Sequence, residues 1–178
     1  TTSGINDESY YGGDGSDWLY WDNSGVTGNR VVNLATGFVT FSGANRDVLS
    51  SIENVGVYNG AGIIGDANAN YLFASGAYDN VIEGGTGDDT IYGGDGNDSL
   101  YAGDGVDLVS GGSGHDVLED GTTSASGNDT FYGGNGNDIL RKASDTSAGV
   151  VKVWDGGNGI DTFEDIFGNA AGAARVIN

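Results

Sequence analysis

The sequence predicts an all-β protein in which short parallel strands wind into a flattened spiral, and three observations lead to that prediction. First, a nine-residue unit repeats without a gap over residues 84–119, reading GGTGDDTIY, GGDGNDSLY, AGDGVDLVS and GGSGHDVLE. Second, the second residue of each unit is glycine and the eighth is aliphatic. Third, the sixth is always aspartate. A fixed period of this length is the sequence signature of stacked repeat architectures.

The columns of the repeat can be written out once residues 75–83, a degraded copy in the same frame, are added. Column two holds Gly76, Gly85, Gly94, Gly103 and Gly112; column six holds Asn80, Asp89, Asp98, Asp107 and Asp116; column eight holds Ile82, Ile91, Leu100, Val109 and Leu118.

Composition and charge exclude several classes of function. The chain of 178 residues is long enough for one domain with a core, or for a main domain with a smaller flanking piece. Its 26 acidic and six basic residues give a formal net charge of −20, which would repel nucleic acid and anionic membranes. The absence of cysteine excludes disulfides and thiolate metal sites. No apolar run approaches the roughly 18 residues of a membrane span.

A disordered linker is the alternative for a chain with 35 glycines and many acids. The regular return of Ile, Leu, Val and Phe in column eight argues against it, because a linker has no need to keep an apolar column.

The N-terminal residues 1–55 are expected to form a β-rich cap. They contain one isolated copy of the repeat, GGDGSDWLY at residues 12–20, with Asp17 in column six and Leu19 in column eight. Residues 31–34 and 38–41 are β-prone runs on either side of a turn.

The conformation of residues 45–57 stays open between a loop, a short helical turn and an irregular strand. Residues 56–164 are expected to form the spiral. Its first units are degenerate: residues 56–64 keep only Ile63 and have Ala61 in column six, while residues 65–73 offer Asn70 and Leu72, and Ala74 follows as a one-residue insertion.

Two longer insertions interrupt the C-terminal half, at residues 120–123 and 142–155. The frame returns in SASGNDTFY and GGNGNDILR, which together span residues 124–141, and in GGNGIDTFE at residues 156–164. The tail at 165–178 carries no repeat.

The unit alternates between turn and strand. Glycines in columns one, two and four allow the positive φ angles that a sharp turn requires. Three extended residues follow, and the middle one is apolar, so the period of two points it inward. Turn, strand, turn and strand make a coil with two strands, so residues 18 apart stack directly above each other.

This stacking predicts two rows of acidic residues. One edge would carry Asn80, Asp98, Asp116 and Asp138, and the opposite edge Asp89, Asp107, Asp129 and Asp161. Strands lie about 4.8 Å apart, so stacked carboxylates need a cation between them. The same counting places both insertions on the Asp89 edge, and pairs Asp89 with Asp107 and Asp98 with Asp116 at shared ions.

Calcium suits such sites, because it takes six to eight oxygen ligands and accepts backbone carbonyls, which tight glycine turns expose. Magnesium prefers a smaller octahedron, and zinc lacks its usual ligands in a chain with one histidine. The candidate ligands are aspartates of column six and glycines of the turns: Asp17, Asp89, Asp98, Asp107, Asp116, Asp129, Asp138, Asp161, Gly85, Gly87, Gly94, Gly96, Gly103, Gly105, Gly112 and Gly114.

These nonapeptides resemble the glycine- and aspartate-rich calcium repeats of the RTX family, whose consensus reads GGxGxDxUx. The resemblance covers residues 65–164, together with residues 12–20. It implies a right-handed parallel β-roll that holds several Ca²⁺ ions between successive turns. It also implies a secreted or cell-surface bacterial protein, exported by a type I system and folded on meeting external calcium.

Departures from the family pattern carry their own expectations. Asn80, Asn70 and Ala61 replace the aspartate, so the N-terminal coils are expected to bind calcium weakly or not at all. The chain begins with Thr-Thr-Ser and its tail lacks the family's export signal, so we expect a segment of a longer parent protein, whose other domains would be its partners.

The alternatives to metal binding are simple. Column-six aspartates could be Asx-turn residues that satisfy local amides. His115 occupies the variable fifth position and is interpreted as a solvent-facing filler. With no HExxH motif and one histidine in a glycine turn, the segment is not expected to be an enzyme.

An aromatic cluster near the N-terminus has two interpretations: Tyr10, Tyr11, Trp18, Tyr20 and Trp21. It could close the end of the roll as a hydrophobic cap, or it could be a platform on which sugar rings stack. The second interpretation supports an alternative function, a polysaccharide- or cell-surface-binding module.

Overall fold

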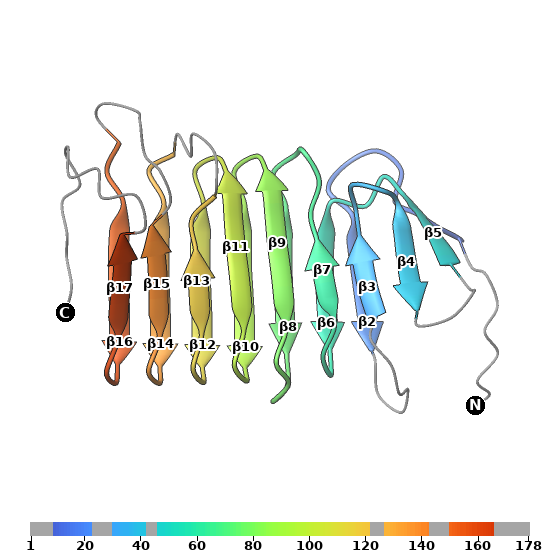
Figure 1. Cartoon of the computed structure of the whole chain (residues 1–178). Coiled ribbons are helices and arrows are strands. Elements are labelled where there is room, and N and C mark those ends of the chain that lie inside the picture. The colour runs from blue at the N-terminus through green and yellow to red at the C-terminus, as the bar shows by residue number, and fades with distance from the viewer. Residues whose placement is uncertain (1–8, 23–29, 42–45, 122–126, 143–149, 166–178) are drawn as a thin grey trace.

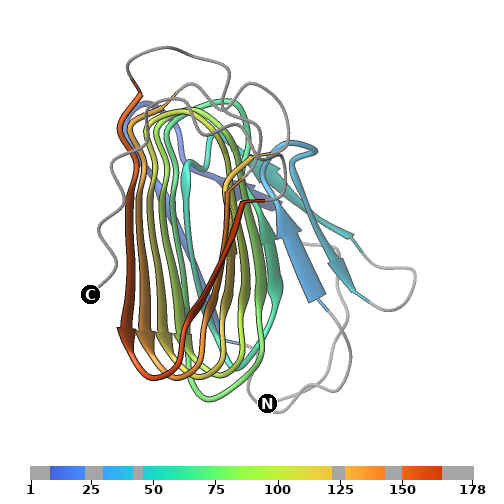
Figure 2. The same cartoon turned by 60° about the vertical axis from the view of Figure 1, so that its left-hand side comes forward.

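The chain forms two mostly parallel β-sheets that face each other across a narrow core (Figures 1 and 2). The structure is a computed structural model that describes residues 9–22, 30–41, 46–121, 127–142 and 150–165. Within these ranges every regular element is a strand. The strands are β1 (Ser9–Tyr11), β2 (Trp18–Asp22), β3 (Arg30–Asn33), β4 (Phe38–Phe41), β5 (Arg46–Ser50), β6 (Asn54–Tyr58), β7 (Gly62–Ile64), β8 (Tyr71–Ser75), β9 (Val81–Thr86), β10 (Thr90–Asp95), β11 (Ser99–Asp104), β12 (Leu108–Ser113), β13 (Val117–Glu119), β14 (Thr130–Asn135), β15 (Ile139–Lys142), β16 (Val153–Asn158) and β17 (Thr162–Asp165).

From β6 onward, consecutive strands alternate between the two sheets. The seven-stranded sheet has the order β16-β14-β12-β10-β8-β6-β2, and the ten-stranded sheet has the order β1-β5-β4-β3-β7-β9-β11-β13-β15-β17. Each strand therefore pairs in parallel with the strand two further along the chain, as Leu100 does with Leu118. The predicted all-β fold, a parallel β-roll with two strands per coil, is confirmed.

The core is built mainly from the column-eight side chain of each strand, and some strands add a second buried side chain, such as Val57 of β6 and Ala102 of β11. Column eight of the seven-stranded sheet supplies Leu19, Val55, Leu72, Ile91, Val109, Phe131 and Trp154, and that of the ten-stranded sheet supplies Val32, Ile63, Ile82, Leu100, Leu118 and Leu140. All of these side chains are buried. Because neighbours in the same strand point outward, the burial pattern of β11 alternates along its length.

The N-terminal part extends the ten-stranded sheet with antiparallel pairs. β3 and β4 form the predicted hairpin, with Gly37 in the turn at φ 72°, and β4 then pairs antiparallel with β5. Of the open alternatives for residues 45–57, the described part is two strands, β5 and β6. The sheet does not break between residues 55 and 56, because β6 crosses that boundary.

The repeat at residues 12–20 is not isolated in space. Its strand β2 pairs in parallel with β6, and Leu19 lies opposite Val55 in the core. It is therefore the first coil of the seven-stranded sheet (Figure 1).

The second insertion is shorter than predicted. Lys142 was assigned to it, yet it ends β15 and pairs with Asp165. The last three residues assigned to it begin β16 and pair with β14: Val153, Trp154 and Asp155. The Trp154 ring stacks on Phe131 with centroids 4.2 Å apart, in the place of an aliphatic column-eight residue. The repeat pattern does not reveal this unit, because lysine replaces aspartate in column six and tryptophan replaces an aliphatic residue in column eight.

Truncation of a column-eight side chain should destabilise the roll. Leu100→Ala removes a fully buried side chain and is expected to lower the free energy of unfolding by about 2–5 kcal/mol. Val81→Ala truncates the exposed neighbour of Ile82 and should change it by less than about 0.5 kcal/mol. Denaturant unfolding in calcium-containing buffer measures both; equal effects would contradict the assignment of the core.

Candidate metal centre

Column-six side chains stack along both edges of the roll. Each carboxylate accepts, through Oδ1, a hydrogen bond from the backbone N–H of the column-six residue one coil earlier. Asp98 N donates to Asp116 Oδ1 and Asp89 N donates to Asp107 Oδ1, each at 2.8 Å. The stacking of these aspartates at intervals of 18 residues is as predicted, whereas the sharing of an ion within each pair stays a prediction.

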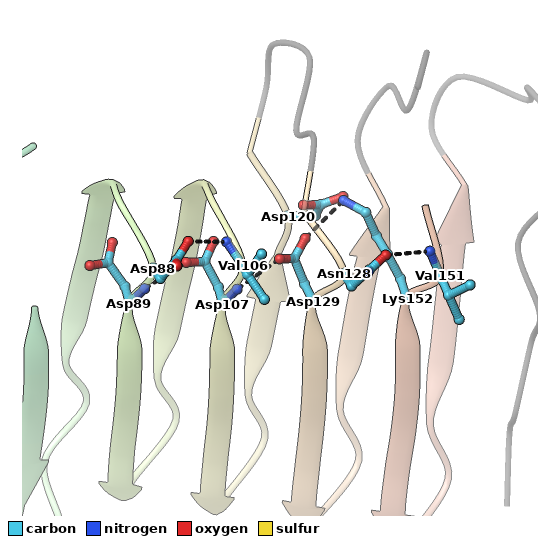
Figure 3. Close-up of polar contacts among 9 residues, drawn as sticks. All are labelled: Asp88, Asp89, Val106, Asp107, Asp120, Asn128, Asp129, Val151 and Lys152. Carbon is cyan, nitrogen blue, oxygen red and sulfur yellow. Dashed lines mark hydrogen bonds and ion pairs between the residues drawn. The ribbon is translucent and has the colours of Figure 1, made fainter. Parts of the chain in front are cut away.

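We name the two rows by one member each. The Asp98 edge contains Ala61, Asn80, Asp98, Asp116, Asp138 and Asp161. The Asp89 edge contains Asp17, Glu53, Asn70, Asp89, Asp107, Asp129 and Lys152. Figure 3 shows Asp89, Asp107, Asp129 and Lys152 in a line along successive strands.

The predicted position of Asp161 on the Asp89 edge is wrong. Its Oδ1 accepts from Asp138 N at 2.9 Å, so it belongs to the Asp98 edge. The reason is the additional unit with Lys152 in column six, which takes the next place on the Asp89 edge and shifts Asp161 to the opposite one.

The described residues that flank both insertions nevertheless lead to the Asp89 edge, as predicted. One insertion follows β13 and precedes Asp129, and the other follows β15 and precedes Lys152. Residues 122–126 and 143–149 lie outside the described residues.

The second oxygen of each carboxylate is what makes the rows candidate metal sites. Six column-six aspartates in the two rows are at most 3% exposed: Asp89, Asp98, Asp107, Asp116, Asp129 and Asp138. In all six of them Oδ2 is buried without a hydrogen-bond partner, and the same holds for Oδ2 of Asp17. Asp129 differs, because its Oδ2 forms an ion pair with Lys152.

The Asx-turn alternative does not explain this arrangement. It would have the carboxylate accept from amides of its own turn, whereas the Oδ1 atoms accept from the neighbouring coil and the Oδ2 atoms from no group. A buried anionic oxygen without a partner is costly unless a cation neutralises it.

Glycines of the turn have two separate roles. In columns two and four they adopt positive φ, as at Gly94 (101°) and Gly96 (116°). The other predicted turn glycines share this conformation: Gly85, Gly87, Gly103, Gly105, Gly112 and Gly114.

Glycine in column one serves a different purpose from the predicted positive φ. A Cβ at Gly93 would lie 2.4 Å from Asp98 Oδ2, and one at Gly111 would lie 2.3 Å from Asp116 Oδ2. At these two positions glycine is favoured because the carboxylate occupies the space that a side chain would need; Ala102 is an exception in column one.

Stacked turns also bring backbone carbonyls close to the next coil. A Cβ at Gly105 would lie 1.8 Å from the carbonyl oxygen of Gly87, and one at Gly114 would lie 1.7 Å from that of Gly96. No group of three acidic or histidine side chains converges within the described residues. A metal ion in these rows would therefore take carboxylates in pairs and complete its shell with carbonyl oxygens, a mixture that suits calcium.

Burial makes the carboxylates poor anions when no cation is present. Desolvation raises the pKa of Asp89 to about 7, against the hydrogen bond from Asn70 N and with help from the charge of Asp107. Desolvation likewise raises the pKa of Asp116 to about 7 and that of Asp107 to about 6. The pKa values of Asp98 and Asp138 are raised for the same reason.

A second ladder, which the sequence analysis missed, runs through column five. On the Asp98 edge, Asn97 N donates to Asp79 Oδ1, His115 N donates to Asn97 Oδ1, and Asn137 N donates to His115 Nδ1, at 2.7–2.8 Å. His115 is exposed, as predicted, but it is more than a filler, because its ring accepts a backbone hydrogen bond. The recurrence of Asp, Asn and His in column five was the available signal.

The geometry defines a parallel β-roll with repeated oxygen-rich sites between its coils, and comparison with known families agrees. The model of the RTX calcium-binding nonapeptide repeat matches in four copies, at residues 2–20, 75–109, 83–118 and 124–141. The chain thus carries RTX calcium-binding repeats. No curated protein matches it. Over the described residues there is no helix of the length and apolarity needed to cross a membrane.

Acidification should favour folding of the chain in the absence of calcium. The pKa values of Asp89, Asp107 and Asp116 lie above their ordinary value in the folded chain, which therefore binds more protons than the unfolded chain between about pH 4 and about pH 7. Protonation of these carboxylates therefore stabilises the folded chain, and this contribution to the free energy of unfolding increases as the pH falls from about 7 to about 4. Circular dichroism in EDTA should show the folded fraction rising from about pH 8 to about pH 5. A fraction that falls over this range would contradict the burial of these carboxylates.

Proposed function

We propose that this chain is a calcium-binding β-roll module of a secreted or surface-attached bacterial protein, and that calcium controls its folding. The observation that carries the proposal is the row of buried Oδ2 atoms without partners on each edge. At a net charge of −20, these carboxylates oppose folding until divalent ions neutralise them.

Calcium would be held between neighbouring coils. On the Asp89 edge the carboxylates would be those of Asp89 and Asp107, and on the Asp98 edge those of Asp98, Asp116 and Asp138. The ion supplies positive charge at Oδ2, while Oδ1 keeps its backbone hydrogen bond and fixes the carboxylate in place.

Ion binding is expected to fall off toward the N-terminal coils. Asn70 and Asn80 already use their side-chain amides in hydrogen bonds, the first to Glu53 O and the second to Tyr78 O. Neutral amides need no counter-ion, so these coils are proposed to stack without tightly bound calcium.

In its parent protein the module would fold after export, where extracellular calcium is plentiful, and would stabilise a neighbouring domain. RTX repeats occur typically in secreted bacterial proteins, which supports the location. We assign no catalytic role to the segment, since its column-six carboxylates belong to the rows and its histidine to the column-five ladder.

Removal of calcium should unfold the roll. Circular dichroism is expected to show a β spectrum in millimolar calcium, its loss in EDTA, and its cooperative return on titration. A β spectrum that EDTA leaves unchanged at neutral pH would sink the proposal.

Loss of one ladder carboxylate should weaken calcium binding. Asp107→Asn removes a buried ligand and is expected to lower the apparent calcium affinity by about tenfold or more. Asp95→Asn removes the same charge from an exposed side chain and serves as the matched control. Isothermal titration should separate the two; equal affinities would mean that Asp107 is not a ligand.

A second candidate function rests on exposed aromatic side chains. The N-terminal cluster divides in two: Trp21 packs edge-to-face on Tyr10 against the core, as a cap would, whereas Trp18 and Tyr20 stack on the outer face of the seven-stranded sheet. Trp18 is also 5.1 Å from the ring of Tyr71 on β8.

This outer strip, made of Trp18, Tyr20, Tyr71 and Phe73, is proposed to bind an uncharged polysaccharide. Trp18 and Tyr20 are 38% and 59% exposed, which leaves ring surface for contact with sugars. The negative charge of the chain disfavours acidic polymers.

Glycan-array binding tests this second function. Trp18→Ala should remove binding to neutral glycans, while Tyr132→Ala, an exposed aromatic on β14 of the same sheet, should not. Equal signals from both variants, or no binding by the unaltered chain, would count against it.

A further inference from the structure

Lys152 occupies the place where the next aspartate of the Asp89 edge would stand. It directly precedes Val153, which pairs with Thr130, just as Asp129 directly precedes Thr130. Its side chain is 1% exposed although lysine is rarely buried. At the equivalent position one half-coil later, the Asp98 edge keeps its aspartate, Asp161.

The ammonium of Lys152 contacts two buried carboxylates. Nζ lies 2.5 Å from Asp120 Oδ2 and 3.0 Å from Asp129 Oδ2, and both acids are at most 1% exposed (Figure 3). Asp129 Oδ2, like Oδ2 of Asp89 and Asp107, is buried without a hydrogen-bond partner, but it alone of the three faces the ammonium of a lysine.

The network keeps the lysine charged. Burial alone would lower the pKa of Lys152, but hydrogen bonds and attraction to Asp120 and Asp129 outweigh it and raise that pKa. Desolvation raises the pKa of Asp120 to about 6, an effect that the hydrogen bond from Lys152 opposes and the charge of Asp129 reinforces. A permanent positive charge therefore stands beside Asp129 Oδ2.

A structural ion pair with no relation to the metal rows is the simpler alternative. Two features argue against it. The lysine stands in column six, in register with the aspartates, and its Nζ neutralises the oxygen left without a partner in the neighbouring coils. The second carboxylate, Asp120, comes from the first insertion, so both departures from the plain repeat meet at this point.

We propose that Lys152 is a built-in cation that takes the place of a calcium ion at Asp129 and closes the row of metal sites on the Asp89 edge. The proposal rests on the calcium function proposed above. It implies that the two edges of this roll differ in capacity, because the Asp98 edge continues to Asp161 and the Asp89 edge ends in an internal ion pair.

Calcium stoichiometry tests this directly. Isothermal titration with calcium alone should show that Lys152→Gln, which frees Asp120 and Asp129 for a metal ion, binds one ion more than the unaltered chain. Arg141→Gln removes an equal charge from a pair with Glu164 at the surface and should leave the stoichiometry unchanged.

A second variant guards against misfolding of the first. The double substitution Lys152→Asp with Asp120→Asn rebuilds the composition of an ordinary pair of coils, with one aspartate in each turn, and should also gain one ion.

Each outcome decides the matter. A gain of one ion by either folded variant supports the proposal. An unchanged number in the variants that fold, or failure of both to fold in saturating calcium, overturns it, since calcium would then be unable to replace the ammonium. If the unaltered chain binds no calcium, the proposed function itself fails. That outcome is distinct from failure of the Lys152 proposal, in which the unaltered chain binds calcium and the variants gain no ion.

Discussion

The roll depends on the different roles of the two oxygen atoms in each column-six carboxylate. Oδ1 accepts a backbone hydrogen bond from the coil before, as in the contact between Asp98 N and Asp116 Oδ1, and this bond holds neighbouring turns in register. Oδ2 points to the space beside the column-one glycine and is buried. The same side chain thus links neighbouring coils by a hydrogen bond and places an uncompensated negative charge at their edge. With strands about 4.8 Å apart, the charges repel along each row, and this repulsion is the basis of the proposal that folding requires a cation.

The core alone is thin. Each strand contributes one column-eight side chain, and the outward neighbours are half-buried or exposed. Repeat proteins gain stability from contacts between neighbouring units, so ions between coils would add to those contacts and make folding cooperative. On the Asp89 edge, the positions on either side of the run from Asp89 to Asp129 relieve the charge by other means. Asn70 is neutral, and Lys152 brings its own positive charge. The centre of the roll is therefore the part that we propose needs calcium.

Much of this could be predicted from the sequence, because a strict period fixes both topology and register. Glycine in columns two and four, the apolar column eight and the stacking of Asp89 on Asp107 all follow from counting in nines. Counting failed where the period was hidden. The unit with Lys152 and Trp154 has lysine instead of aspartate in column six and a larger side chain than usual in column eight. Because this unit was not counted, Asp161 was placed on the wrong edge.

Two further features lay beyond counting for physical reasons. The role of column-one glycine depends on where the carboxylate rotamer puts Oδ2, and the column-five ladder depends on side chains reaching backbone groups of the adjacent coil. The ion pair between Asp120 and Lys152 joins residues 32 apart through two irregular segments, and no repeat predicts it.

Hydrogen exchange at the ladder amides is the most direct test of the link between charge and folding. The backbone N–H groups of Asp89, Asp98 and Asp107 donate to the carboxylates of the next coil and should exchange slowly when calcium is present. In EDTA at neutral pH they should lose this protection together with the amides of β10 and β11. Protection that persists unchanged in EDTA would show that the buried carboxylates need no cation, and would contradict calcium control of the fold.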